Sequence, residues 1–155
     1  AAGKVGEVRF DPFAMLPFIG YNAGDYMQHW LDIGERDGAK LPELFWVNWF
    51  RRGEDGSFLW PGFGDNSRVL KWVLERVAGE GDATETPIGL VPTADALDLD
   101  GLDIDDDVLD ELLSVDAESW RQEIPLIEGQ FEFIGERLPE RLRDQLGDLE
   151  KRLSS

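Results

Sequence analysis

The sequence predicts a mixed α and β fold that ends in a helical tail. Short segments rich in aromatic and β-branched residues alternate with amphipathic helical patterns before residue 102, and helical patterns fill the rest. The chain has 155 residues, 42% of them apolar and 11% aromatic, which suffices for a hydrophobic core. We expect a mixed α/β segment over residues 1–102 and a helical tail over residues 103–155, packed on the same domain.

The N-terminal part combines a short strand, a loop and a helix. We expect residues 6–18 to form a strand and then an irregular loop, because Pro12 and Pro17 are incompatible with a regular helix. A helix follows in which apolar residues recur at helical spacing, and either Asn22 or Asp25 caps its start.

A strand and a hairpin are predicted next. Residues 44–50, LFWVNWF, are almost continuously apolar, which is typical of a strand buried on both faces. Asp55 and Gly56 then suit a tight turn, and residues 58–60 form the returning strand.

A second helix follows the hairpin. It carries apolar residues on one face over residues 69–77, and Asp65 or Asn66 is suited to be its N-cap. Residues 79–86 then predict a polar loop, and residues 87–92, PIGLVP, a short strand or extended segment.

The last third is predicted to be helical. Residues 108–115 suggest a short helix, and a longer apolar stripe follows at helical spacing: Trp120, Ile124, Ile127, Phe131, Ile134 and Leu138. Pro125 interrupts this stripe and predicts either a kink or a helix start there. Pro139 begins a final helix with leucines at 142, 146, 149 and 153.

Composition and charge exclude several functions. The net charge is −18, which disfavours nucleic acid and anionic membranes as partners, because both are bound through lysine and arginine. No apolar run is long enough to span a bilayer, and the N-terminus lacks a signal-peptide pattern, so we expect a cytoplasmic protein. The absence of cysteine excludes disulfides and thiolate chemistry.

No metal site or catalytic motif is predicted. Nine carboxylates crowd residues 95–111, but aligning an EF-hand on Gly101 puts Ala96 at its first position and Asp107, rather than glutamate, at its last. We therefore expect a solvated acidic loop. His29 is the single histidine, so neither a zinc site nor a Ser-His-Asp triad is indicated.

The stretch FLWPGFGDNSRVLKW, residues 58–72, carries the strongest functional signal. Phe50, Phe58 and Phe63 could flank a flat ligand, and stacking a nucleobase on an aromatic ring contributes roughly 1–3 kcal/mol. Asn66 has both a donor and an acceptor with which to read a base edge. The competing interpretation is that these rings belong to the core and that Asn66 is merely a helix cap.

Longer segments around this stretch resemble a known family. DPFAMLPFIGYNAGDYMQHWL, KLPELFWVNWFRRGEDGSFLWPGFGDNSRVLKWVLERV and TPIGLVPTADALDLDGL are similar to the C-terminal part of GTP-dependent phosphoenolpyruvate carboxykinase. The resemblance covers residues 6–102, and the chain would be roughly the last quarter of such an enzyme. It implies part of the C-terminal nucleotide-binding domain of that fold.

The resemblance implies a guanine pocket. The family converts oxaloacetate and GTP to phosphoenolpyruvate, GDP and carbon dioxide, in gluconeogenesis. Phe50 and Phe63 would sandwich the guanine base, and Phe58 would close its edge. The guanine edge would be read, through backbone groups and one side-chain amide, by the stretch Phe63, Gly64, Asp65 and Asn66.

The resemblance also implies what lies elsewhere. The phosphate loop, the reactive cysteine, the ligands of Mn²⁺ or Mg²⁺ and the arginines for oxaloacetate would precede Ala1, so this chain holds no catalytic residue and would be inactive alone. Its partners would be a guanine nucleotide and the rest of a monomeric enzyme. The alternatives are a non-catalytic acidic scaffold or interaction domain, or a fragment that folds but binds nothing.

Overall fold

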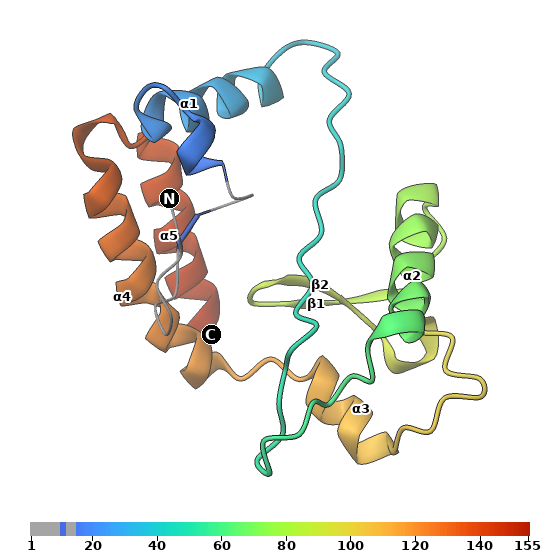
Figure 1. The fold of residues 1–155 in the computed structure, drawn as a ribbon. Coiled ribbons are helices and arrows are strands. Elements are labelled where there is room, and N and C mark those ends of the chain that lie inside the picture. Colours follow the sequence, from blue (N-terminus) through green and yellow to red (C-terminus); the bar gives the residue numbers. More distant parts are fainter. Residues whose placement is uncertain (1–9, 12–14) are drawn as a thin grey trace. The chain divides into compact units, whose positions relative to one another are not determined.

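The computed structural model describes residues 10–11 and 15–155 (Figure 1). The strand expected within residues 6–18 lies largely outside this range. The chain divides into two compact units. One unit combines the N-terminal residues up to Leu41 with Ala117–Ser155, and the other spans Pro42–Asp116.

The first unit is helical. Helices α4 and α5 lie side by side, and α1 contacts the turn that joins them (Figure 1). Its elements are η2 (Leu16–Phe18), α1 (Ala23–Gly34), α4 (Ala117–Ile134), the 3-10 turn η5 (Gly135–Arg137) and α5 (Glu140–Leu153).

Helix α1 is capped by Asn22, one of the two predicted caps. The Asn22 side-chain oxygen accepts a hydrogen bond from the Gly24 backbone N–H at 2.7 Å. The Asn22 amide nitrogen donates to the Ile134 carbonyl at 3.4 Å, so the cap also ties α1 to the end of α4. Asp25 instead forms an ion pair with Arg137 at 2.7 Å.

Helix α4 continues through Pro125, so the predicted helix start at that residue is wrong. Proline removes one backbone hydrogen bond from a helix interior. The apolar stripe on either side offsets that loss, because Ile124 and Ile134 are both buried.

The second unit surrounds a small core of Trp72, Leu97 and Leu109. The indole N–H of Trp72 is satisfied by the Asp82 carbonyl at 2.9 Å. The unit contains the 3-10 turn η3 (Phe63–Asp65), α2 (Asn66–Ala78), β1 (Ala83–Thr86), β2 (Gly89–Pro92), η4 (Ala94–Ala96) and α3 (Asp106–Leu113).

The described residues are mostly helical, with one antiparallel pair of strands, β1 and β2. The mixed α and β class is therefore confirmed only in this reduced form. Part of the segment expected as a polar loop, residues 79–86, is strand β1, because Ala83 to Thr86 pair with Pro92 to Gly89.

The strand predicted over residues 44–50 is absent. Among the described residues no neighbouring strand pairs with it, and an unpaired strand leaves its backbone hydrogen bonds unmade. Phe45 alone packs against the core, 6.0 Å from Trp72 between ring centroids, whereas Trp46 is 81% exposed. Burial on both faces is thus also wrong.

The predicted hairpin is present in a minimal form. Arg52 and Phe58 form a single antiparallel bridge, and the Gly53 N–H donates to the Ser57 carbonyl at 3.1 Å. The tight turn is confirmed, but the returning strand over residues 58–60 shrinks to that bridge.

The second unit includes helix α3. Helix α3 belongs with α2, because Leu109 packs against Trp72 and Leu97. The acidic run expected as a solvated loop ends in α3, with Asp105 as the N-cap and two aspartates in the first turn, where negative charge is favourable.

Candidate functional site

The hairpin that carries Phe50 and Phe58 is anchored to α3 by Arg51. One guanidinium nitrogen of Arg51 donates to the carbonyls of Leu112 and Ser114 at 3.1 and 3.0 Å. The other nitrogen donates to the Ser114 hydroxyl at 3.0 Å. A cation at the C-terminal end of a helix satisfies open carbonyls and suits the helix dipole, so Arg51 fixes the base of the hairpin.

Phe50 and Phe58 form one wall of the candidate site. Their ring centroids are 6.0 Å apart with a tilt of 58°, and their exposed fractions are 72% and 50%. The guanidinium carbon of Arg52 lies 3.9 Å from the centroid of Phe58. One face of Phe58 is therefore covered by a cation, while half of the residue remains exposed.

Phe63 projects from an unusual backbone conformation. Its φ angle is +48°, the one positive value for a non-glycine residue in the described ranges, and its side chain is 94% exposed. The preceding Gly62 also has positive φ, at 79°. An exposed phenylalanine in the left-handed region costs backbone energy without gaining burial, which is typical of functional sites rather than core positions.

Asn66 starts α2 beside this ring. Its side-chain oxygen accepts a hydrogen bond from the indole N–H of Trp60 at 2.9 Å. Asp65 is the N-cap of α2, as one of the two sequence alternatives had it, but its side chain makes no capping bond. The Asp65 carboxylate pairs instead with the Arg68 guanidinium at 3.0 Å.

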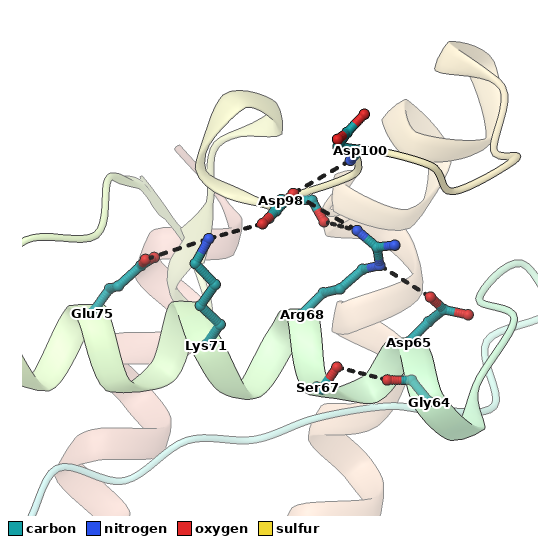
Figure 2. Close-up of polar contacts among 8 residues, drawn as sticks. All are labelled: Gly64, Asp65, Ser67, Arg68, Lys71, Glu75, Asp98 and Asp100. Carbon is teal, nitrogen blue, oxygen red and sulfur yellow. Dashed lines mark hydrogen bonds and ion pairs between the residues drawn. The ribbon is translucent and has the colours of Figure 1, made fainter.

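Basic residues of α2 bind the acidic segment, residues 95–111, at Asp98 (Figure 2). Asp98 accepts from Lys71 at 2.9 Å, and its backbone carbonyl accepts from Arg68 at 2.6 Å. The hydrogen bond from Lys71 lowers the pKa of Asp98, and Asp98 in turn raises the pKa of Lys71. Part of the predicted acidic loop is therefore paired with α2 rather than freely solvated.

The backbone of the turn offers polar groups of both kinds. The Gly64 carbonyl accepts from the Ser67 hydroxyl at 2.7 Å (Figure 2), and the Asp65 N–H donates to the Gly62 carbonyl at 3.1 Å. Within the described residues, no hydrogen bond is donated by the Gly64 N–H.

The structure brings some of the predicted residues together. Phe50 contacts Phe58 through their rings, and Phe63 adjoins Asn66 in the turn, but Phe63 makes no ring contact within the described part of the chain. Two cavities are described, of about 440 Å³ beside Leu70 and Leu74 and about 220 Å³ beside Met27 and Trp30. Neither is lined by the predicted site residues, whose three rings are at least half exposed.

The described ranges contain neither a metal-binding cluster nor a membrane-spanning helix. Those residues contain no group of three or more histidine, cysteine, aspartate or glutamate side chains that could hold a metal ion. In the same ranges, no helix combines the length and apolar character needed to cross a membrane. His29 is exposed on α1, as expected of an ordinary helix residue.

Sequence reasoning missed the contacts of three residues that shape the site: Arg51, Arg52 and Trp60. Two adjacent arginines after NWF carry no spacing signal, and the carbonyls that Arg51 binds lie 61 and 63 residues away. The sequence placed Trp60 next to the proposed slot, but its hydrogen bond to Asn66 was not predicted. Its proximity to Asn66, six residues later, was the available signal.

Comparison with known proteins identifies the family. Residues 1–152 match the family described as "Phosphoenolpyruvate carboxykinase C-terminal P-loop domain". The chain is 56% identical over 154 residues to phosphoenolpyruvate carboxykinase (GTP) of Renibacterium salmoninarum. It is 53% identical over 155 residues to the protein of that name from Arthrobacter sp., and 52% identical over 155 residues to the one from Corynebacterium glutamicum.

These alignments include almost the whole chain but a limited part of each relative. They cover 99%, 99% and 100% of the chain and 25% of each relative. The chain thus spans about one quarter of the length of these curated relatives. Because the family match extends over nearly every residue, the chain belongs to the GTP-dependent phosphoenolpyruvate carboxykinase family, within its C-terminal P-loop domain.

Proposed function

We propose that this chain is the guanine-binding portion of a GTP-dependent phosphoenolpyruvate carboxykinase. The whole enzyme would convert oxaloacetate and GTP to phosphoenolpyruvate, GDP and carbon dioxide in the cytoplasm. The observation that carries the proposal is the turn at Phe63, where an exposed ring in a left-handed conformation adjoins the amide of Asn66.

In this proposal Phe50 and Phe63 stack on the two faces of guanine, and Phe58 borders its edge. The exposure of all three rings supports this role, because rings that served as core would be buried against α2. Arg52 keeps one face of Phe58 covered, which suits an edge contact. Gly64 and Asp65 would contribute backbone groups, since the Asp65 carboxylate is engaged by Arg68.

Exposure alone does not single out these rings, because a quarter-length chain also exposes surface that would pack against the rest of the enzyme. Trp46, for example, is 81% exposed but does not have the left-handed backbone of Phe63. The left-handed backbone at Phe63 and the adjacent amide separate Phe63 from such residues. In this proposal the divalent metal, the phosphate loop and the reacting groups belong to the rest of the enzyme.

Kinetics of the full-length enzyme that carries this segment would test the proposal. Phe63→Ala should raise the KM for GTP by roughly tenfold with little change in kcat, because base stacking is lost. Asn66→Ala should reduce the preference for GTP over ATP. Phe133→Ala is the matched control, because Phe133 is 75% exposed on α4, in the other unit. Unchanged kinetics in both site variants would remove the assignment.

Tryptophan fluorescence separates base recognition by this chain from recognition by the complete pocket. Because Trp60 bonds directly to Asn66, we expect GDP, but not ADP, to change the emission of the isolated chain in a saturable way. No response from a folded chain, followed by a response from the full-length enzyme, would show that the upstream part completes the pocket.

A further inference from the structure

We infer that Trp60 is a positioning residue that makes the base site selective for purines with an oxygen at position 6. This inference rests on the proposed guanine site. Trp60 is 5% exposed, and its indole N–H donates to the side-chain oxygen of Asn66 at 2.9 Å. Trp60 would not touch the base and would act through the orientation of the Asn66 amide.

The chemistry of the two side chains fixes that orientation. An indole N–H can only donate a hydrogen bond, whereas an asparagine amide has an accepting oxygen on one side and a donating nitrogen on the other. The group that faces Trp60 must therefore be the oxygen. Rotating the amide by half a turn would place two donors against each other and leave a buried N–H unsatisfied.

The nitrogen of Asn66 is consequently the group available to a ligand. Within the described part of the chain, no hydrogen bond is donated by the Asn66 side-chain nitrogen. The side chain is half-buried at the start of α2, three residues after the exposed ring of Phe63. Asn66 thus presents a donor, and not an acceptor, beside the proposed stacking surface.

A donor at this place distinguishes purines by their substituent at position 6. Guanine and hypoxanthine carry an accepting oxygen there, while adenine carries a donating amino group. The amide held by Trp60 matches the first two and opposes the third. It does not sense the 2-amino group, so Asn66 should separate GTP and ITP together from ATP, rather than GTP from ITP.

The test compares ITP with ATP in the full-length enzyme, because both lack the 2-amino group and differ at position 6 and in the protonation of N1. In Trp60→Phe a smaller aromatic ring remains and the indole N–H is lost, so the amide can rotate. We expect the ratio of kcat/KM for ITP over ATP to fall roughly five- to tenfold. The change should arise in KM, and the ratio of GTP to ITP should stay constant.

Trp49→Phe is the matched control. Trp49 is half-buried in the same segment, and among the described residues its indole makes no hydrogen bond. It should therefore leave the ITP-to-ATP ratio unchanged. An equal ratio in Trp60→Phe, Trp49→Phe and the parent enzyme would overturn the inference.

Asn66→Asp provides a second test that keeps the indole N–H. Trp60 would still donate to one carboxylate oxygen, and the other oxygen would present an acceptor to the base. We expect the preference to move toward ATP in this variant. Adding Trp60→Phe to Asn66→Asp should then have little effect on the ratio, because a carboxylate presents oxygens in either orientation.

The outcomes separate this inference from the proposed function. If Phe63→Ala and Asn66→Ala leave nucleotide kinetics unchanged, the proposed site itself is wrong, and the role of Trp60 falls with it. If those variants weaken GTP use while Trp60→Phe keeps the parent ratio of ITP to ATP, the site stands and the role of Trp60 is wrong.

Discussion

Phe63 combines a left-handed backbone with an almost fully exposed ring. For a residue with a Cβ atom, this conformation costs about 1–2 kcal/mol. A glycine would avoid that cost, as Gly62 does immediately before it. At the residue scale, the chain therefore gives up stability to hold a ring in solvent, which fits a ring that is covered when a ligand binds.

The stability lost to the left-handed backbone can be measured with two substitutions at Phe63. Both Phe63→Ala and Phe63→Gly remove the ring, but only glycine relieves the backbone. Phe63→Gly should be more stable than Phe63→Ala by about 1 kcal/mol in urea unfolding of the 155-residue chain. The same pair at Phe133, inside α4, should show the opposite order, because alanine is the better helix former.

Helix α1 depends on a close contact at Gly24. A Cβ atom built on Gly24 would lie 2.3 Å from the Arg137 carbonyl oxygen, so the backbones of α1 and η5 touch there. The contact is framed by the Asn22 cap and the ion pair between Asp25 and Arg137. At the scale of elements, this glycine sets how closely the first helix approaches the last two.

Gly24→Ala should therefore lower the free energy of unfolding by roughly 2–3 kcal/mol, since backbone atoms must move to admit the methyl group. Gly34→Ala tests the opposite case in the same helix. Its nearest neighbour would be a Leu41 methyl at 3.6 Å, so stability should hold or rise slightly. Equal losses in the two variants would contradict the close-contact argument.

Helix α2 is tied to the acidic segment by the bond between Lys71 and Asp98. Because the folded state lowers the pKa of Asp98, the pair adds stability above about pH 4 and loses it as the pH falls further. Because it also raises the pKa of Lys71, that stability persists until the pH rises beyond about 10.

We accordingly expect Asp98→Asn to lower the urea midpoint at pH 7 and to have a progressively smaller effect as the pH falls below about 4 and through the lowered pKa of the native carboxylate. The difference should shrink in high salt, because the pair is exposed. Asp103→Asn is the control, since Asp103 belongs to the same segment without an ion pair among the described residues. A pH-independent effect of Asp98→Asn would point to packing instead.

At the scale of the whole molecule, the chain forms two compact units, one of which is made from both ends of the sequence. Helix α1 has 12 residues, a length that is marginal for a helix without tertiary contacts. Its cap, its ion pairs and its closest backbone contact all involve residues beyond 133. Helix α1 therefore depends on the C-terminal helices α4 and α5 for its order.

Removing residues 117–155 should release α1 while sparing the second unit. In hydrogen exchange, amides of α1 should lose protection in the truncated chain, and those of α2 should keep it, because the Trp72 core contains no residue after 113. Equal protection of α1 in both chains would show that its order does not depend on α4 and α5.

Short-range signals in the sequence determined most of the helices. Helices α1, α2, α3 and α5 follow from apolar spacing, polar caps and Pro139, since these act within a few residues. The turn at Gly56 and the stretch that carries Phe58 and Phe63 could be predicted for the same reason. The family was likewise recognisable from contiguous motifs, and the match over residues 1–152 confirms it.

Contacts between distant residues decided the rest. Residues 44–50 have the composition of a buried strand, but a strand exists only where another pairs with it, and in the described part of the chain none does. The continuation of α4 through Pro125 depended on burial of its apolar stripe. The orientation of the Asn66 amide depended on Trp60. An amide carries an accepting oxygen and a donating nitrogen, and only a fixed neighbour selects which of them faces outward.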